Sequence, residues 1–126
     1  MNLTVNGTTH DVESGPLATL LDVTFEKPAA SAFAAIDYPH THEYTVLAVT
    51  GVRTTGGETR LAATGLAGFG TRLRSAEAVA SDPGRAGAAA VADVSFGDDA
   101  LASAWYRERT LPVLVRRVLG ELEEAA

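Results

Sequence analysis

The segment 37–44, Asp-Tyr-Pro-His-Thr-His-Glu-Tyr, is the densest cluster of chemically capable side chains in this sequence. Pro39 predicts a turn or loop entry and restricts Tyr38 to extended conformations. His40 and His42 stand two residues apart, beside carboxylates and phenols. Imidazole and carboxylate groups can move protons or bind metals, so this segment is the first candidate for a functional site.

Three interpretations of the segment remain open. It can be an ordinary polar loop that follows a strand. It can bind a metal through both histidines together with Glu43 or Asp37, although this spacing matches no strong metal signature. It can also supply acid–base catalysis by one histidine and a carboxylate, because imidazole titrates near neutral pH. We take His40, His42 and Glu43 as candidate catalytic residues and assign no metal.

Other candidates lie outside this segment. Trp105 and Tyr106 begin the last helical stretch. Trp105 can anchor the core or form a pocket wall. Tyr106 can lie with its hydroxyl at the surface or donate a hydrogen bond to a substrate. Arg72 and Arg74 lie where the chain leaves the sheet, as surface charge or as partners of an anionic ligand. Tyr106 therefore joins the candidate catalytic residues. The candidate substrate-binding residues are Tyr38, Tyr44, Trp105, Arg72 and Arg74.

Alternating apolar residues predict strands through the first half of the chain. Asn6-Gly7 and Gly56-Gly57 are turn sequences of the kind that join hairpin strands. The predicted elements are a hairpin over 1–14 and strands over 31–36, 45–55 and 58–65. Residues 17–25 fit either a helix or a strand.

The second half of the chain has helical periodicity. Helices are predicted over 75–80, with Ser75 as the N-cap, and over 85–94, with Asp82-Pro83-Gly84 ending the first of them. A last helix follows Gly97, capped by Asp98 or Asp99. Its apolar stripe comprises Trp105, Leu111, Leu114, Val115, Val118, Leu119 and Leu122.

Two features of this last helix have structural consequences. Pro112 lies inside the apolar pattern and is expected to kink or split the helix. The arginines 107, 109, 116 and 117 are expected on a solvated face, paired with glutamates.

Strands followed by helices indicate an α+β fold. We expect one domain over 1–126, with a small antiparallel sheet of three to five strands and two or three C-terminal helices packed on one face. The sheet end that carries the 37–44 loop is expected to approach Trp105 and Tyr106. Otherwise the proposed pocket does not form.

Composition limits the functional classes. The length of 126 residues suits a single domain, and the net charge of −6 argues against nucleic-acid binding. The chain has no cysteine, which excludes disulfides, thiolate metal sites and iron–sulfur clusters. No apolar run approaches a membrane span, so a cytoplasmic protein is expected.

Three stretches resemble a known family. Residues 102–119, Ala-Ser-Ala-Trp-Tyr-Arg-Glu-Arg-Thr-Leu-Pro-Val-Leu-Val-Arg-Arg-Val-Leu, are similar to the closing helix of the flavoprotein (medium) subunit of molybdenum hydroxylases, the carbon monoxide dehydrogenase and xanthine dehydrogenase family. Residues 66–77 and the strand 45–52 are similar to earlier parts of the same C-terminal domain. The resemblance covers residues 17–120, in the family's order. The leading hairpin, 1–15, resembles the start of the family's iron–sulfur subunit, without its cysteines.

The resemblance implies a domain without the family's cofactors. The two FAD-binding subdomains are missing, so we expect no independent FAD, iron–sulfur or molybdopterin chemistry and assign no cofactor. The first functional class is a repurposed enzyme or binding domain that guides isomerisation, cyclisation or hydrolysis of an organic, biosynthetic substrate. The alternative is a non-catalytic accessory or structural subunit that docks with flavin or molybdenum partners. Exposed sheet edges suggest a homodimer in either case.

Overall fold

The structure is a computed structural model that describes residues 2–5, 8–11, 27–38 and 44–125. Near the N-terminus, β1 (Asn2–Val5) and β2 (Thr8–Asp11) pair antiparallel, which confirms the predicted hairpin strands. Residues 17–25, for which helix and strand were both open, lie outside the described residues.

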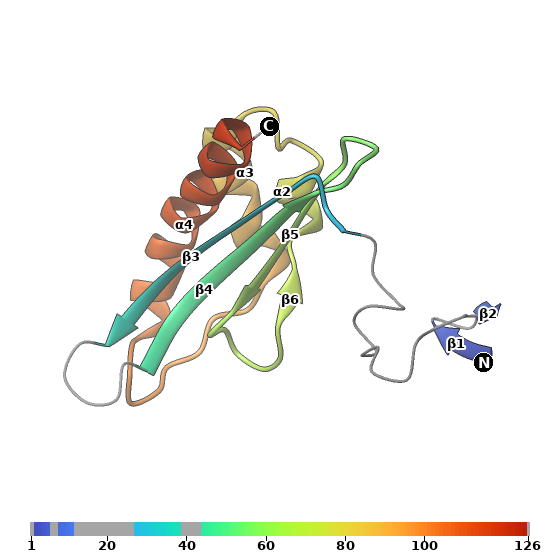
Figure 1. The fold of residues 1–126 in the computed structure, drawn as a ribbon. Helices are drawn as coiled ribbons and strands as arrows, with labels where there is room; N and C mark the ends of the chain where they lie inside the picture. Colours follow the sequence, from blue (N-terminus) through green and yellow to red (C-terminus); the bar gives the residue numbers. More distant parts are fainter. Residues whose placement is uncertain (1, 6–7, 12–26, 39–43, 126) are drawn as a thin grey trace.

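The main sheet has four antiparallel strands in the order β3-β4-β5-β6 (Figure 1). The strand bounds are Ala30–Tyr38 for β3, Tyr44–Arg53 for β4, Thr59–Thr64 for β5 and Thr71–Arg72 for β6. The three long strands match the predicted ones. The two-residue β6 is too short to leave an alternating pattern in the sequence. Gly57 makes the predicted β4–β5 turn with a φ of +86°, a conformation that glycine adopts without a side-chain clash.

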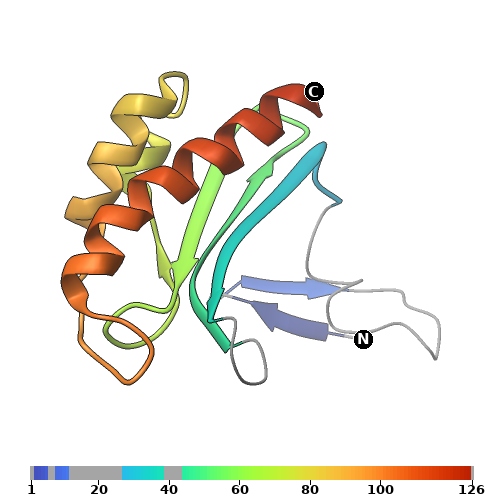
Figure 2. The same ribbon diagram turned by 90° about the vertical axis from the view of Figure 1, so that its left-hand side faces the viewer.

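Helices cover one face of this sheet (Figure 2). They are α2 (Arg74–Glu77), α3 (Pro83–Ala90), the 3-10 turn η1 (Val91–Asp93) and α4 (Ala104–Glu124). The expected α+β architecture is confirmed. Within the described residues, no helix combines the length and the apolar character needed to cross a membrane.

The core lies between α4 and the covered face of β3, β4 and β5. On the sheet, Leu47, Val49 and Leu61 are fully buried, and Val49 pairs with Ala34 on one side and Ala63 on the other. The apolar stripe of α4 is buried as predicted from Leu111 onward; its buried members are Leu111, Leu114, Val115, Val118, Leu119 and Leu122. Small residues on β3 and leucines on α4 thus set the spacing between helix and sheet.

Pro112 does not split α4, which is continuous from Ala104 to Glu124. A Cβ added to Gly87 of α3 would lie 2.8 Å from the carbonyl oxygen of Pro112. Glycine at position 87 therefore allows α3 to pack tightly against α4 beside the proline.

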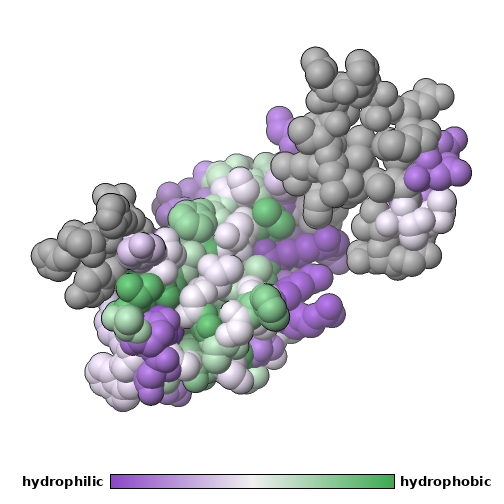
Figure 3. Space-filling model, turned by 90° about the horizontal axis from the view of Figure 1, so that it is seen from below, coloured by the Kyte–Doolittle hydropathy of each residue, from purple (hydrophilic) through white to green (hydrophobic). Residues whose placement is uncertain are grey.

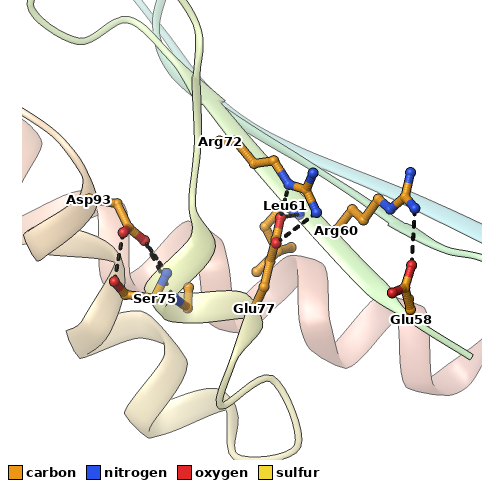
Figure 4. Close-up of polar contacts among 8 residues, drawn as sticks. Glu58, Arg60, Leu61, Arg72, Ser75, Glu77 and Asp93 are labelled. Atoms are coloured by element: carbon orange, nitrogen blue, oxygen red, sulfur yellow. Dashed lines mark hydrogen bonds and ion pairs between the residues drawn. The ribbon is translucent and has the colours of Figure 1, made fainter. Parts of the chain in front are cut away.

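The predicted starts of the first two helices are wrong. Ser75 lies inside α2 and does not cap it; its hydroxyl and its backbone N–H instead donate to Asp93, at 2.7 and 2.8 Å (Figure 4). Pro83 begins α3, and Asp82 is its N-cap, accepting from the N–H of Arg85. Proline is favoured at the first position of a helix, so Asp82-Pro83 starts α3. The prediction that Asp82-Pro83-Gly84 only ends the preceding helix misses this role.

We predict that Gly51→Ala destabilises the domain by about 1–3 kcal/mol, as overpacked cores do. An added Cβ would clash with the side chains of Val118 and Leu122, so these side chains or α4 itself would have to shift. Urea denaturation measures the loss. The matched control is Gly120→Ala in α4, which meets nothing within 4 Å and gains about 0.5–1 kcal/mol of helix propensity. Equal stability of the wild type and Gly51→Ala would contradict this packing.

Candidate functional site

A cavity of about 310 Å³ lies between the sheet end at the β3–β4 connection and the start of α4. This sheet end therefore approaches the start of α4 at Tyr106, as predicted from the sequence. The lining residues are Ile36, Asp37, Val46, Leu101, Ala102, Ser103 and Tyr106. Most of these residues are apolar, and Asp37, Ser103 and Tyr106 are the polar ones.

A β-bulge shapes the sheet side of the cavity. Ile36 pairs with Leu47 and Asp37 pairs with Thr45, which leaves Val46 as an extra residue on β4. A bulge re-aims side chains locally, and Val46 is 3% exposed in the cavity lining. The Thr45 hydroxyl donates to Oδ1 of Asp37 at 2.8 Å. The bulge therefore brings the apolar side chain of Val46 to the cavity.

The start of α4 forms the opposite wall. Ser103 is the N-cap, and its Oγ accepts from the N–H of Tyr106 at 3.2 Å. The predicted caps, Asp98 and Asp99, are wrong as caps because the helix begins only at Ala104. Asp98 still serves the helix end, since its Oδ1 accepts from the N–H of Ala104 at 2.6 Å. A negative group thus already occupies this positive helix end.

Arg107 holds the loop before α4 in place. One guanidinium nitrogen, Nη1, donates to the carbonyl oxygens of Gly97 at 2.6 Å and Ala102 at 3.0 Å. The other, Nη2, donates to both carboxylate oxygens of Asp99 at 2.7 Å. Arg107 is only 3% exposed, so its expected place on a solvated face is wrong. Its position four residues before Leu111 continues the buried stripe of the helix by one turn, and this spacing was the signal available in the sequence.

The ion pair with Arg107 also changes the titration of Asp99. Hydrogen bonds from Arg107, then from the backbone N–H groups of Ala102 and Leu101, lower the pKa of Asp99 to about 2. The Asp99 side chain is 53% exposed, so solvent screens the carboxylate although the guanidinium is buried.

Tyr106 and Trp105 occupy different environments. Tyr106 lines the cavity and is 41% exposed. Trp105 is 62% exposed, which makes the core-anchor interpretation wrong, and it is not a lining residue of this cavity. The Arg109 guanidinium carbon lies 4.8 Å from the centre of the Trp105 ring, in cation–π geometry.

Exposed aromatic side chains gather at this end of the domain. Tyr44 begins β4 and is 55% exposed, and Phe69, in the loop between β5 and β6, is 96% exposed. That loop lies against the bulge, because a Cβ on Gly65 would meet the carbonyl oxygen of Val46. Figure 3 looks at this end and shows apolar and neutral residues over much of the visible surface. Aromatic residues are enriched at recognition surfaces, so the cavity lies in a surface of suitable composition.

Arg72 and Arg74 lie elsewhere, in an open cleft of about 950 Å³. This cleft is lined by Arg53 at the end of β4 and Glu123 near the end of α4, so it lies at the opposite end of the domain from the cavity. Arg72 donates two hydrogen bonds to Glu77, at 2.8 and 3.0 Å (Figure 4). These bonds raise the pKa of Arg72. The structure therefore does not bring these arginines together with Tyr106.

The candidates in the β3–β4 connection are not all described. His40, His42 and Glu43 lie outside the described residues, and so does the side chain of Tyr38, whose backbone pairs with Tyr44. Their catalytic and binding roles stay predictions. Among the described residues, no three histidine, aspartate or glutamate side chains are grouped as metal ligands.

The comparisons with known proteins identify the fold. Carbon monoxide dehydrogenase from Hydrogenophaga pseudoflava has 21% identity and a TM-score of 0.66, over 76% of this chain and 37% of that chain. The enzyme from Oligotropha carboxidovorans gives 22% identity and a TM-score of 0.66 over the same shares. Quinoline 2-oxidoreductase from Pseudomonas putida 86 gives 14% and 0.62, over 75% and 37%. No protein-family model matches the chain, and no curated protein matches it in sequence.

These neighbours confirm the resemblance to part of the molybdenum hydroxylases at the level of fold. The chain spans little more than a third of the length of the solved chains it matches, 37% in each case. The likeness therefore concerns the fold of one part of these enzymes.

We predict that the Arg107–Asp99 ion pair contributes stability that is lost in acid. Because the folded-state pKa of Asp99 is about 2 and the ordinary value is 3.8, the contribution is complete above about pH 4 and disappears as the pH falls towards 2. The free energy of unfolding by urea, measured from pH 6 to pH 2, should therefore fall less for Asp99→Asn than for the wild type.

The control is Glu108→Gln, which removes an exposed carboxylate from α4 next to Arg107 in the sequence. Its free energy of unfolding should depend on pH as the wild type's does. Identical pH dependence for Asp99→Asn and the wild type would contradict the role of the pair.

Proposed function

We propose that the chain binds a small organic molecule in the cavity between the bulged sheet end and the start of α4, and acts on it without a bound cofactor. The observation that supports this proposal is the composition of the cavity, which combines apolar walls with a few converging polar groups. Its volume of about 310 Å³ is at the lower end of the range for small-molecule sites. Such a site can guide an isomerisation, a cyclisation or a hydrolysis by shape and one or two proton-transfer groups.

Each polar group has a proposed role. The phenol of Tyr106 donates a hydrogen bond to an oxygen or nitrogen of the substrate. A histidine, His40 or His42, takes or returns a proton, with Glu43 setting its charge state. Support for including these histidines comes from chain reach: His40 and His42 follow Asp37 by three and five residues, and Asp37 is a lining residue of the cavity. Tyr38, Tyr44 and Trp105 are proposed to contact the rest of the substrate.

We predict that His42→Ala lowers turnover by at least about a hundredfold, the usual contribution of a general acid or base. The melting temperature should be unchanged. Candidate substrates are small, mainly apolar organic molecules that fit about 310 Å³, and conversion is followed by mass spectrometry. His10→Ala is the matched control, since His10 is exposed on β2. Full activity of both His40→Ala and His42→Ala would refute the assignment of this segment.

A second candidate function is a non-catalytic accessory or structural subunit of a molybdenum-hydroxylase-like oxidoreductase complex. Two observations favour it: the solved neighbours are oxidoreductase chains that are much longer than the shared domain, and the sheet face away from the helices is uncovered at Phe33, which is 61% exposed. Stable co-purification with larger flavin or molybdenum subunits, lost in Phe33→Glu, would favour this function over the first.

The chain would work in the cytoplasm as a homodimer. Among the described strands, β3 pairs only with β4, so its other edge can pair with a second copy. Sedimentation of the purified protein gives its oligomeric state directly.

A further inference from the structure

We infer that the free edge of β3 binds β3 of a second copy in antiparallel orientation, across a two-fold axis at Phe33. This inference rests on the proposed function, because it names the surface and the register through which the proposed homodimer forms. β3 is the first strand of the four-stranded sheet, and the pairing joins two such sheets into one (Figure 1). The surface consists of residues 27–37 and is named the β3 edge.

The backbone groups on the free side of β3 belong to its odd-numbered residues. The N–H of Thr54 donates to the carbonyl oxygen of Glu58 at 2.8 Å, so even-numbered residues of β4 bond towards β5 and odd-numbered ones towards β3. In the β3–β4 register, the odd-numbered residues of β4 lie opposite even-numbered residues of β3. Ser31, Phe33 and Ala35 therefore direct their N–H and carbonyl groups away from β4, where another strand can bind them.

The β3 edge lacks the features that keep sheet edges from pairing. Natural edge strands are usually short, or carry charged residues, prolines or bulges. β3 is 9 residues long, and residues 29–36 contain no charged residue and no proline. The extra residue of the bulge, Val46, lies on β4. The composition and length of β3 therefore favour the addition of a further strand.

The charges at the two ends of the β3 edge favour a second copy as that strand. Lys27 precedes β3 and Asp37 lies near its end, and both residues are exposed. Antiparallel pairing of β3 with its own copy brings each Lys27 towards Asp37 of the second copy, and the two-fold axis forms this ion pair twice. The Thr45 hydroxyl bonds Oδ1 of Asp37, which leaves Oδ2 as an acceptor for the lysine. Because Asp37 is a lining residue of the cavity, the second copy lies beside the candidate site.

Phe33 selects the register of the pairing. Its side chain is 61% exposed on the sheet face away from the helices. An axis at Phe33 places the two phenylalanine rings directly opposite each other on this face, and aromatic cross-strand pairs stabilise antiparallel strands. Ser31 then pairs with Ala35 of the second copy. Lys27 lies diagonally across from Asp37, at a separation that a long side chain spans.

Sedimentation of the full chain over a range of concentrations measures the dissociation constant of the dimer. Phe33→Lys should raise this constant by about tenfold or more, because it replaces an aromatic pair with two like charges. The matched control is Thr64→Lys, which adds the same charge to the same sheet face on β5, two strands from the edge. This control should dimerise as the wild type does.

A charge exchange tests the orientation of the two strands. Lys27→Asp and Asp37→Lys should each weaken the dimer by about threefold to tenfold, since each replaces both ion pairs with like charges. The double variant should recover the wild-type constant. These two substitutions change the net charge in opposite directions, so a net-charge effect would strengthen one dimer and weaken the other.

Hydrogen exchange reports on the backbone pairing itself. The amides of Phe33 and Ala35 should exchange slowly at concentrations where the chain is dimeric and faster after dilution to the monomer. A dimer that Phe33→Lys does not weaken, or that Thr64→Lys weakens equally, would overturn the pairing at this edge and leave the proposed homodimer. Opposite effects of Lys27→Asp and Asp37→Lys would overturn the antiparallel register.

A chain that is monomeric at every concentration would contradict both the edge pairing and the proposed homodimer. Slow exchange of the Phe33 and Ala35 amides in such a monomer would show that the chain covers this edge itself. Fast exchange would leave the edge to a different protein. The small-molecule site is tested separately by the activity of the histidine variants, so its failure does not affect this inference.

Discussion

The candidate site depends on the hydrogen bonds and the ion pair that the buried guanidinium of Arg107 makes. A buried charge is costly unless its donors are satisfied, and Arg107 satisfies its Nη groups with Asp99 and the carbonyls of Gly97 and Ala102. These bonds fix the loop before α4 to the first turn of the helix. That loop supplies Leu101, Ala102 and Ser103 to the cavity wall. The shape of the cavity therefore depends on one ion pair and its backbone bonds.

The two ends of the domain are chemically different. One end carries the cavity, the bulge at Val46 and the exposed aromatic side chains. The other end carries an open cleft lined by arginines and glutamates, of which Arg72 and Glu77 form an ion pair (Figure 4). The buried stripe of α4 on β3 and β4 joins these ends and keeps both walls of the cavity in register. A largely apolar ligand suits the first end only.

Periodicity made most of the fold predictable. The long strands alternate, and the stripe from Leu111 to Leu122 follows helical spacing, so both were found from the sequence. Side-chain hydrogen bonds decide the helix starts, and the hydrophobic pattern does not show them: Asp93, for example, accepts from the hydroxyl of Ser75, 18 residues earlier in the chain. At the site, Tyr106 was found, whereas Val46 depended on a bulge and Arg107 on burial of a charged residue. Neither bulges nor paired buried charges change the hydrophobic pattern that sequence analysis uses.

The central claim is that the cavity beside α4 is where this chain binds its ligand. Filling it tests the claim most directly. Ala102→Phe places a ring in the cavity and keeps the carbonyl that Arg107 binds. Calorimetric titration of this variant with a small uncharged aromatic probe such as 2-phenylethanol should show no binding at an unchanged melting temperature, while Ala100→Phe, in the same loop but exposed, should bind as the wild type does. Wild-type affinity in Ala102→Phe would contradict the account.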